Sequence, residues 1–196
     1  MRKISDLELY PDCQLIQVYN AELDDSYVYH YVTDETVRQG FYGFPGSYNF
    51  YSIGYCLSLK IEVWLSTQQE EVEIETDTVR AIIVPFACHK SGIKIASPLR
   101  DKEYLIEIPQ GEYALVFEIK LRNDEEYLNN SEEYRNNVRD GATQEQCHLT
   151  FYSQSKPVEP QILRVDAWST PPYHLEGYLP LNPTYPLLLR EEKLPS

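Results

Sequence analysis

Several features are missing from this sequence, and each absence excludes a class of function. None of its windows reaches the run of about 18 apolar residues that a membrane-spanning helix needs. Residues 1–6 lack the apolar core of a secretion signal, so we expect a cytoplasmic protein whose cysteines stay reduced. The cysteines are few and widely spaced, with no CxxC pair of the kind found in metal ribbons and redox motifs. They are Cys13, Cys56, Cys88 and Cys147.

Catalytic motifs are also missing. The chain has no glycine-rich phosphate loop, GxSxG elbow or HExxH helix. Two Cys-His dipeptides, Cys88-His89 and Cys147-His148, could together offer four zinc ligands. Adjacent residues of a strand point to opposite faces, however, so buried cysteines beside surface histidines are favoured over a zinc site. We therefore predict no enzyme, no metal and no cofactor.

The charge balance is strongly one-sided. Lysine and arginine number 17 against 31 acidic residues, which gives a net charge of −14. Such a chain repels the phosphates of nucleic acid and anionic lipid, so neither is an expected partner. A basic protein would instead be attracted and steered toward it. Charge alone favours a simpler interpretation, in which the acidity only aids solubility.

Alternation of apolar and polar residues predicts an all-β fold. Every second residue is apolar from Leu57 to Leu65 and again from Tyr113 to Leu121. This period indicates strands with one face in a core, and it places Glu118 and Lys120 on a face toward water. Shorter runs rich in β-forming residues predict further strands. They are residues 14–19, 27–32, 79–87, 93–96, 104–108, 149–152 and 162–165.

We predict an antiparallel β-sandwich, C2-like or jelly-roll-like, formed by residues 1–170. Pro109-Gln110-Gly111 predicts a hairpin, Lys90-Ser91-Gly92 a turn, and Thr33 to Gln39 one short helix. Residues 123–146 are polar throughout and form a long insertion. Residues 171–196 are rich in proline and leucine, which predicts an arm packed on the domain or on a partner.

A dense acidic run lies between the predicted strands. If it is extended, four carboxylates share one face, opposite Val72 and Ile74. These carboxylates are Glu71, Glu73, Glu75 and Asp77. A solvated charged sheet edge is the first interpretation, a partner-binding strip the second and a calcium site the third. The polar insertion contains a second candidate patch, namely Glu125, Glu126, Glu132 and Glu133.

Three ordered stretches make the chain resemble the competence protein J family. The first stretch pairs an acidic Thr-Asp-Glu segment with Gly-Phe and Gly-Ser-Tyr-Asn-Phe. The second pairs Val-Pro-Phe with Gly-Ile-Lys-Ile. The third contains a Pro-Gln-Gly-Glu-Tyr turn. They begin at Thr33, Val84 and Ile108 and together span about residues 28–117. The polar insertion and the proline-rich arm depart from the family pattern.

The resemblance implies a small acidic bacterial protein that binds and inhibits a DNA-entry nuclease during competence. Carboxylates placed where DNA phosphates would lie give such an inhibitor both fast association and a blocked substrate path. The resemblance transfers no contact residues. Two alternatives remain open: a calcium- or carbohydrate-binding β-sandwich module, suggested by the carboxylate row and the tyrosines, and an enzyme of unknown type.

Overall fold

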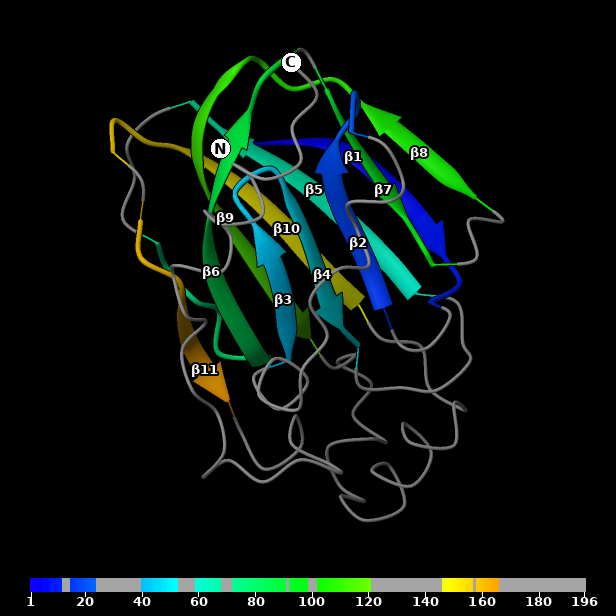
Figure 1. Cartoon of the computed structure of the whole chain (residues 1–196). Helices are drawn as coiled ribbons and strands as arrows, with labels where there is room; N and C mark the ends of the chain where they lie inside the picture. Colours follow the sequence, from blue (N-terminus) through cyan, green and yellow to red (C-terminus); the bar gives the residue numbers. More distant parts are fainter. Residues whose placement is uncertain are drawn as a thin grey trace.

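In the computed structural model, the part of the chain that the structure describes forms eleven strands (Figure 1). The structure describes residues 1–11, 15–23, 40–52, 59–67, 72–90, 92–98, 102–120, 146–156 and 158–165. The strands are β1 (Arg2–Leu9), β2 (Leu15–Asn20), β3 (Phe41–Phe44), β4 (Ser47–Tyr51), β5 (Leu59–Ser66), β6 (Thr78–Cys88), β7 (Ile93–Ala96), β8 (Glu103–Ile106), β9 (Gly111–Lys120), β10 (Gln146–Ser153) and β11 (Gln161–Val165).

The strands form two sheets, which confirms the predicted all-β sandwich. The larger sheet has the order β1-β5-β10-β9-β6-β11, and the smaller has the order β3-β4-β2-β7-β8. Every pairing is antiparallel except that of β5 with β10, which is parallel. The described residues contain no helix long and apolar enough to cross a membrane. The predicted helix at Thr33 to Gln39, the predicted strand at residues 27–32 and the predicted arm at residues 171–196 lie outside the described residues.

The core lies between the two sheets and takes its side chains from both. Phe50 of β4 stacks on Phe117 of β9 with their ring centroids 4.5 Å apart, and both side chains are fully buried. Phe86 and Tyr113 pack edge-on against Phe151. The alternation in β5 and β9 directs every second residue into this core, as predicted. Burial of these rings and aliphatic side chains is the main favourable term in folding.

The turn at Pro109 differs from the prediction. Strands β8 and β9 belong to different sheets, so Pro109 to Gly111 form a corner between the layers and not a hairpin. The hydroxyl of Tyr113 donates a 2.7 Å hydrogen bond to the carbonyl of Pro109, which ties the corner to the start of β9. The chain also changes sheet between β6 and β7, where Lys90 to Gly92 predicted a turn.

Candidate protein-binding surface

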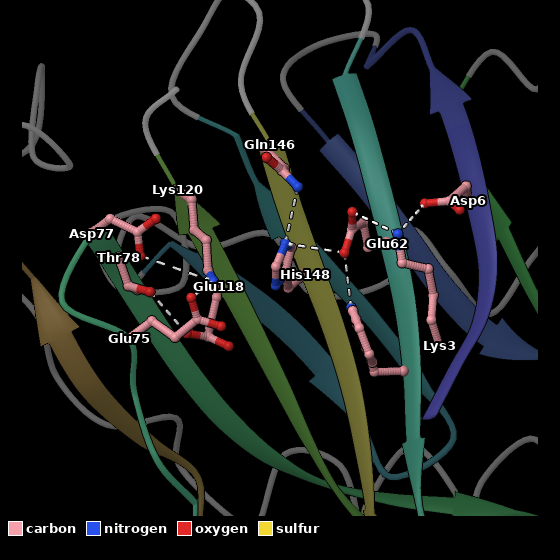
Figure 2. Close-up of polar contacts among 11 residues, drawn as sticks. Lys3, Asp6, Glu62, Glu75, Asp77, Thr78, Glu118, Lys120, Gln146 and His148 are labelled. Atoms are coloured by element: carbon pink, nitrogen blue, oxygen red, sulfur yellow. Dashed lines mark hydrogen bonds and ion pairs between the residues drawn. The ribbon is translucent and has the colours of Figure 1, made fainter. Parts of the chain in front are cut away.

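The outer face of the larger sheet carries a row of polar side chains from neighbouring strands. Asp6 of β1 lies opposite Glu62 of β5, which lies opposite His148 of β10, which in turn lies opposite Glu118 of β9. Figure 2 shows the row crossing the sheet, with a lysine near each end. Because cross-strand neighbours lie about 5 Å apart, their charges interact directly.

At the β1 end, Lys3 compensates two carboxylates that would otherwise repel each other across the strands. Its Nζ lies 2.9 Å from Asp6 and 2.8 Å from Glu62. The hydrogen bonds to Glu62 and then Asp6 raise the pKa of Lys3. Trp64 donates a 3.1 Å hydrogen bond from Nε1 to the other oxygen of Glu62, so this carboxylate is fixed from two sides.

His148 occupies the middle of the row and is largely buried. Its Nε2 lies 3.5 Å from Glu62 and 3.1 Å from the side-chain nitrogen of Gln146. Burial first, and then the charge of Lys120, lower the pKa of His148 below its usual value. We therefore expect a neutral imidazole at pH 7, which makes the contact with Glu62 a polar contact and not an ion pair.

The Cys-His dipeptides do not come together around an ion. Cys147 lies in the core while His148 lies on the outer face, as strand geometry predicted. Cys88 and Cys147 are both free and buried, and His89 is exposed. His148 departs from the expected surface position because only 12% of its side chain is accessible. Within the described residues, no cluster of three or more His, Cys, Asp or Glu side chains could hold a metal ion.

At the far end of the row, Glu118 and Lys120 were predicted to face water, and the structure buries both. They lie on the face opposite the core, as predicted, but are only 5% and 4% accessible. The hydroxyl of Thr78 donates a 2.8 Å hydrogen bond to Glu118. Burial raises the pKa of Glu118, and the Thr78 hydrogen bond and the charge of Lys120 oppose that rise. Thr78 at the start of β6 contacts Glu118, and Glu75 and Asp77 of the segment before β6 contact Lys120.

That segment, residues 72–77, is here named the acidic strap. Its residues Val72 and Ile74 pack on an apolar cluster of the outer face formed by Ile83, Ala114, Val116 and Tyr152. Glu73 and Glu75 are exposed, as the alternation predicted. The packing of Val72 and Ile74 places the strap over the face of the larger sheet, and the strap is not a strand. The first interpretation, a charged sheet edge, is therefore wrong.

Lys120 and Arg164 hold the end of the acidic strap. The Nζ of Lys120 lies 2.5 Å from Glu75 and 3.9 Å from Asp77. The hydrogen bond from Lys120 lowers the pKa of Glu75. Arg164 of β11 donates hydrogen bonds to the backbone carbonyls of Glu75 and Thr78, at 2.6 and 3.2 Å. Part of the acidic run is therefore already paired within the protein.

Five of the predicted contact residues fall outside the described residues. They are Glu71, Glu125, Glu126, Glu132 and Glu133. The structure adds a feature that the sequence did not indicate, an open pocket of about 480 Å³ lined by residues of β1, β5 and β10. Its lining includes Asp6, Glu8, Lys60 and Glu62. No local motif could have revealed it, because the strands that form it are distant in sequence.

The described residues are almost balanced in charge. Of the 31 acidic and 17 basic side chains, they hold 12 and 10, so they account for −2 of the net charge of −14. The remaining surplus belongs to the rest of the chain, including the second candidate patch. On the outer face, each lysine of Figure 2 lies between two carboxylates.

Comparison with known proteins relates the fold to one family. The model of the family described as Competence protein J (ComJ) matches residues 8–152. A crystal structure of ComJ from Bacillus subtilis, described as an inhibitor of the DNA degrading activity of NucA, is similar with a TM-score of 0.58 and 17% identity. That match covers 78% of this chain and 98% of the other. A structure described as crocagin biosynthetic gene J covers 79% of this chain and 99% of its own, with a TM-score of 0.45 and 10% identity. None of the curated proteins matches the chain.

Proposed function

The chain belongs to the competence protein J family, and we propose that it binds and inhibits a nuclease that degrades DNA. The family match over residues 8–152 carries this proposal, because a solved member of the family is described as such an inhibitor. The strongly acidic composition agrees with it, since an inhibitor that replaces DNA must present negative charge to the nuclease.

The protein would act by occupying the nuclease surface, without chemistry of its own. A nuclease attracts DNA phosphates with lysine and arginine side chains, and carboxylates can contact the same side chains in charge-assisted hydrogen bonds. The acidic strap offers exposed carboxylates at Glu73 and Glu75. We propose it as one contact region and the second candidate patch as another, in a protein that works in the cytoplasm.

The two regions would contribute differently to binding. Glu75 is held by Lys120 and can make an oriented short-range contact. The surplus negative charge of the chain lies mostly outside the described residues, so it would act mainly through long-range steering. Steering raises the association rate and weakens with salt, because the screening length is about 8 Å at physiological ionic strength.

The first experiment is inhibition of DNA cleavage by the purified protein. A basic nuclease encoded beside this gene is incubated with labelled duplex DNA and increasing amounts of the protein. We expect cleavage to stop at equimolar protein and the apparent affinity to fall with added salt. If neither binding by calorimetry nor inhibition occurs, the proposed function is wrong.

A second experiment locates the contact region. Glu73→Lys reverses an exposed charge on the acidic strap, and Glu107→Lys makes the same change at an exposed residue just after β8. The acidic strap lies on the outer face of the larger sheet, whereas β8 belongs to the smaller sheet, on the other side of the core. We expect Glu73→Lys to weaken inhibition at least about tenfold and Glu107→Lys to change it less than about twofold. Equal effects would remove the acidic strap from the interface.

The second candidate patch is tested by charge neutralisation. Its four glutamates are replaced together by glutamine: Glu125, Glu126, Glu132 and Glu133. We expect slower association with the nuclease at low salt and an unchanged dissociation rate, because steering acts before contact. A faster dissociation would instead make this patch a direct contact.

A further inference from the structure

Lys120 is a buried cation that contacts the exposed carboxylate of Glu75 and the half-buried carboxylate of Asp77. It is the last residue of β9 and lies opposite Thr78 of β6 and Gln146 of β10 in the sheet register. Its side chain is 5% accessible, whereas 63% of the Glu75 side chain remains accessible. A lysine loses hydration on burial, so it needs nearby anionic partners, and Glu75 and Asp77 supply them.

The acidic strap is attached to the sheet by three different interactions. Val72 and Ile74 bury apolar surface, and Arg164 holds the backbone carbonyl of Glu75. These two interactions hold the backbone against the sheet at residues 72, 74 and 75. The 2.5 Å contact with Lys120 adds an attachment through the Glu75 side chain, which restricts its rotamers and the backbone that carries it, and Asp77 lies 3.9 Å from the same nitrogen. Figure 2 shows Glu75 and Asp77 converging on the Lys120 nitrogen.

We propose that Lys120 is a positioning residue, which orients the carboxylates of the acidic strap for a basic side chain of the partner. This proposal rests on the proposed function. A carboxylate has two oxygens, so Glu75 can accept a hydrogen bond from a partner arginine or lysine while it stays paired with Lys120. A side chain already held in its binding rotamer loses less freedom when the complex forms, and the complex is tighter for that reason.

A positioning role and a purely electrostatic role predict opposite changes in affinity for the nuclease when Lys120 is replaced. Lys120→Met removes a positive charge from beneath the acidic strap. If net charge alone governed binding, the variant would associate faster and bind a basic nuclease more tightly. If Lys120 positions the carboxylates, the variant dissociates about tenfold faster despite its greater negative charge. Lys120→Arg keeps the cation and should restore the wild-type dissociation rate.

The test combines hydrogen exchange with binding kinetics. Amide exchange of residues 73–77 is followed by mass spectrometry in the free protein, and dissociation from the nuclease is measured by surface plasmon resonance. Lys90→Met is the matched control, because it removes an exposed lysine outside the acidic strap. We expect faster exchange and faster dissociation in Lys120→Met only. Unchanged exchange, or tighter binding, overturns the proposal.

A variant that leaves Lys120 in place protects the test against misfolding. Glu75→Gln removes the ion pair at an exposed position, so it should fold even if Lys120→Met does not. Faster exchange of residues 73–77 in the free variant supports positioning and unchanged exchange contradicts it, whereas faster dissociation alone would also follow from the loss of Glu75's own contact with the partner. If the wild-type protein does not bind the nuclease, the proposed function fails, and the exchange data still decide whether Lys120 holds the acidic strap.

Discussion

Thr78→Val tests the buried polar contact on which the outer face of the larger sheet depends. Thr78 is 3% accessible, and its hydroxyl donates to Glu118, which is 5% accessible. Valine has nearly the same shape but cannot donate, so the carboxylate loses a hydrogen bond that water cannot easily replace. A hydrogen bond to a charged group contributes about 1.5–3 kcal/mol, and we expect the free energy of unfolding to fall by that amount at neutral pH.

The stability lost in Thr78→Val should be larger at high pH than at low pH. Burial already raises the pKa of Glu118, and the Thr78 hydroxyl partly opposes that rise. The variant therefore has a still higher pKa for Glu118 in the folded state. A carboxyl group with a raised folded-state pKa destabilises the protein while it is ionised, and this penalty disappears as the pH falls through that pKa. The loss of stability should be largest near pH 8 and smaller at acidic pH, where only a neutral hydrogen bond is missing.

Urea denaturation of wild type and variant at about pH 8 and about pH 5 measures this difference. Thr150→Val is the control, because Thr150 is a buried threonine on the same face that lies opposite Trp64 and Val116 and not opposite a carboxylate. Its cost should be independent of pH. The reasoning is refuted if Thr78→Val costs the same at both pH values, since the hydroxyl would then not stabilise the ionised carboxylate.

Three further predictions concern the core, the polar row and one turn. Phe117→Ala should lower the free energy of unfolding by about 3–5 kcal/mol in urea denaturation, whereas Leu105→Ala, at a 65% accessible site, should change it by less than about 0.5 kcal/mol. Just below pH 6.5 the unfolded state binds a proton that the buried imidazole of His148 resists, so the wild-type protein should lose up to about 1.4 kcal/mol of stability for each unit by which the pH falls. His148→Gln should abolish this loss, and an unchanged pH profile would contradict the lowered pKa of His148. Gly43 has φ +147°, and a Cβ there would lie 2.2 Å from a backbone oxygen. Gly43→Ala should therefore lower the free energy of unfolding by at least about 2 kcal/mol in the same assay, whereas Gly111→Ala should be tolerated.

The core strands were predictable because their signal is local. In β5 and β9 every second residue is apolar, and the structure buries that set between the sheets. Strand β1 carries a weaker form of the same pattern, with Leu7 and Leu9 buried, but its register shifts between Lys3 and Ser5. This irregularity interrupts the period of two, so the sequence did not indicate a strand there.

The errors arise where distant segments decide the outcome. Alternation in β9 correctly placed Glu118 on the outer face, but it could not show that residues about forty positions upstream cover that face. In the same way, the Pro109 turn has the residues of a hairpin, while the pairing of β8 with β7 makes it a corner between sheets. Turn chemistry fixes the local bend and leaves the partners of the flanking strands open.

The charge of the protein shows most clearly what composition can and cannot indicate. Like charges at cross-strand distance destabilise a sheet face, and Lys3 offsets the repulsion between Asp6 and Glu62 on the larger sheet. Lys120 pairs in turn with Glu75 and Asp77 of the acidic strap. The acidic strap is therefore partly neutralised by a residue that lies far from it in sequence. Net charge counts every carboxylate equally, whereas recognition depends on those that remain accessible and oriented. The value of −14 thus supports attraction of a basic partner, and the pairing around Lys120 decides which carboxylates can make a defined contact.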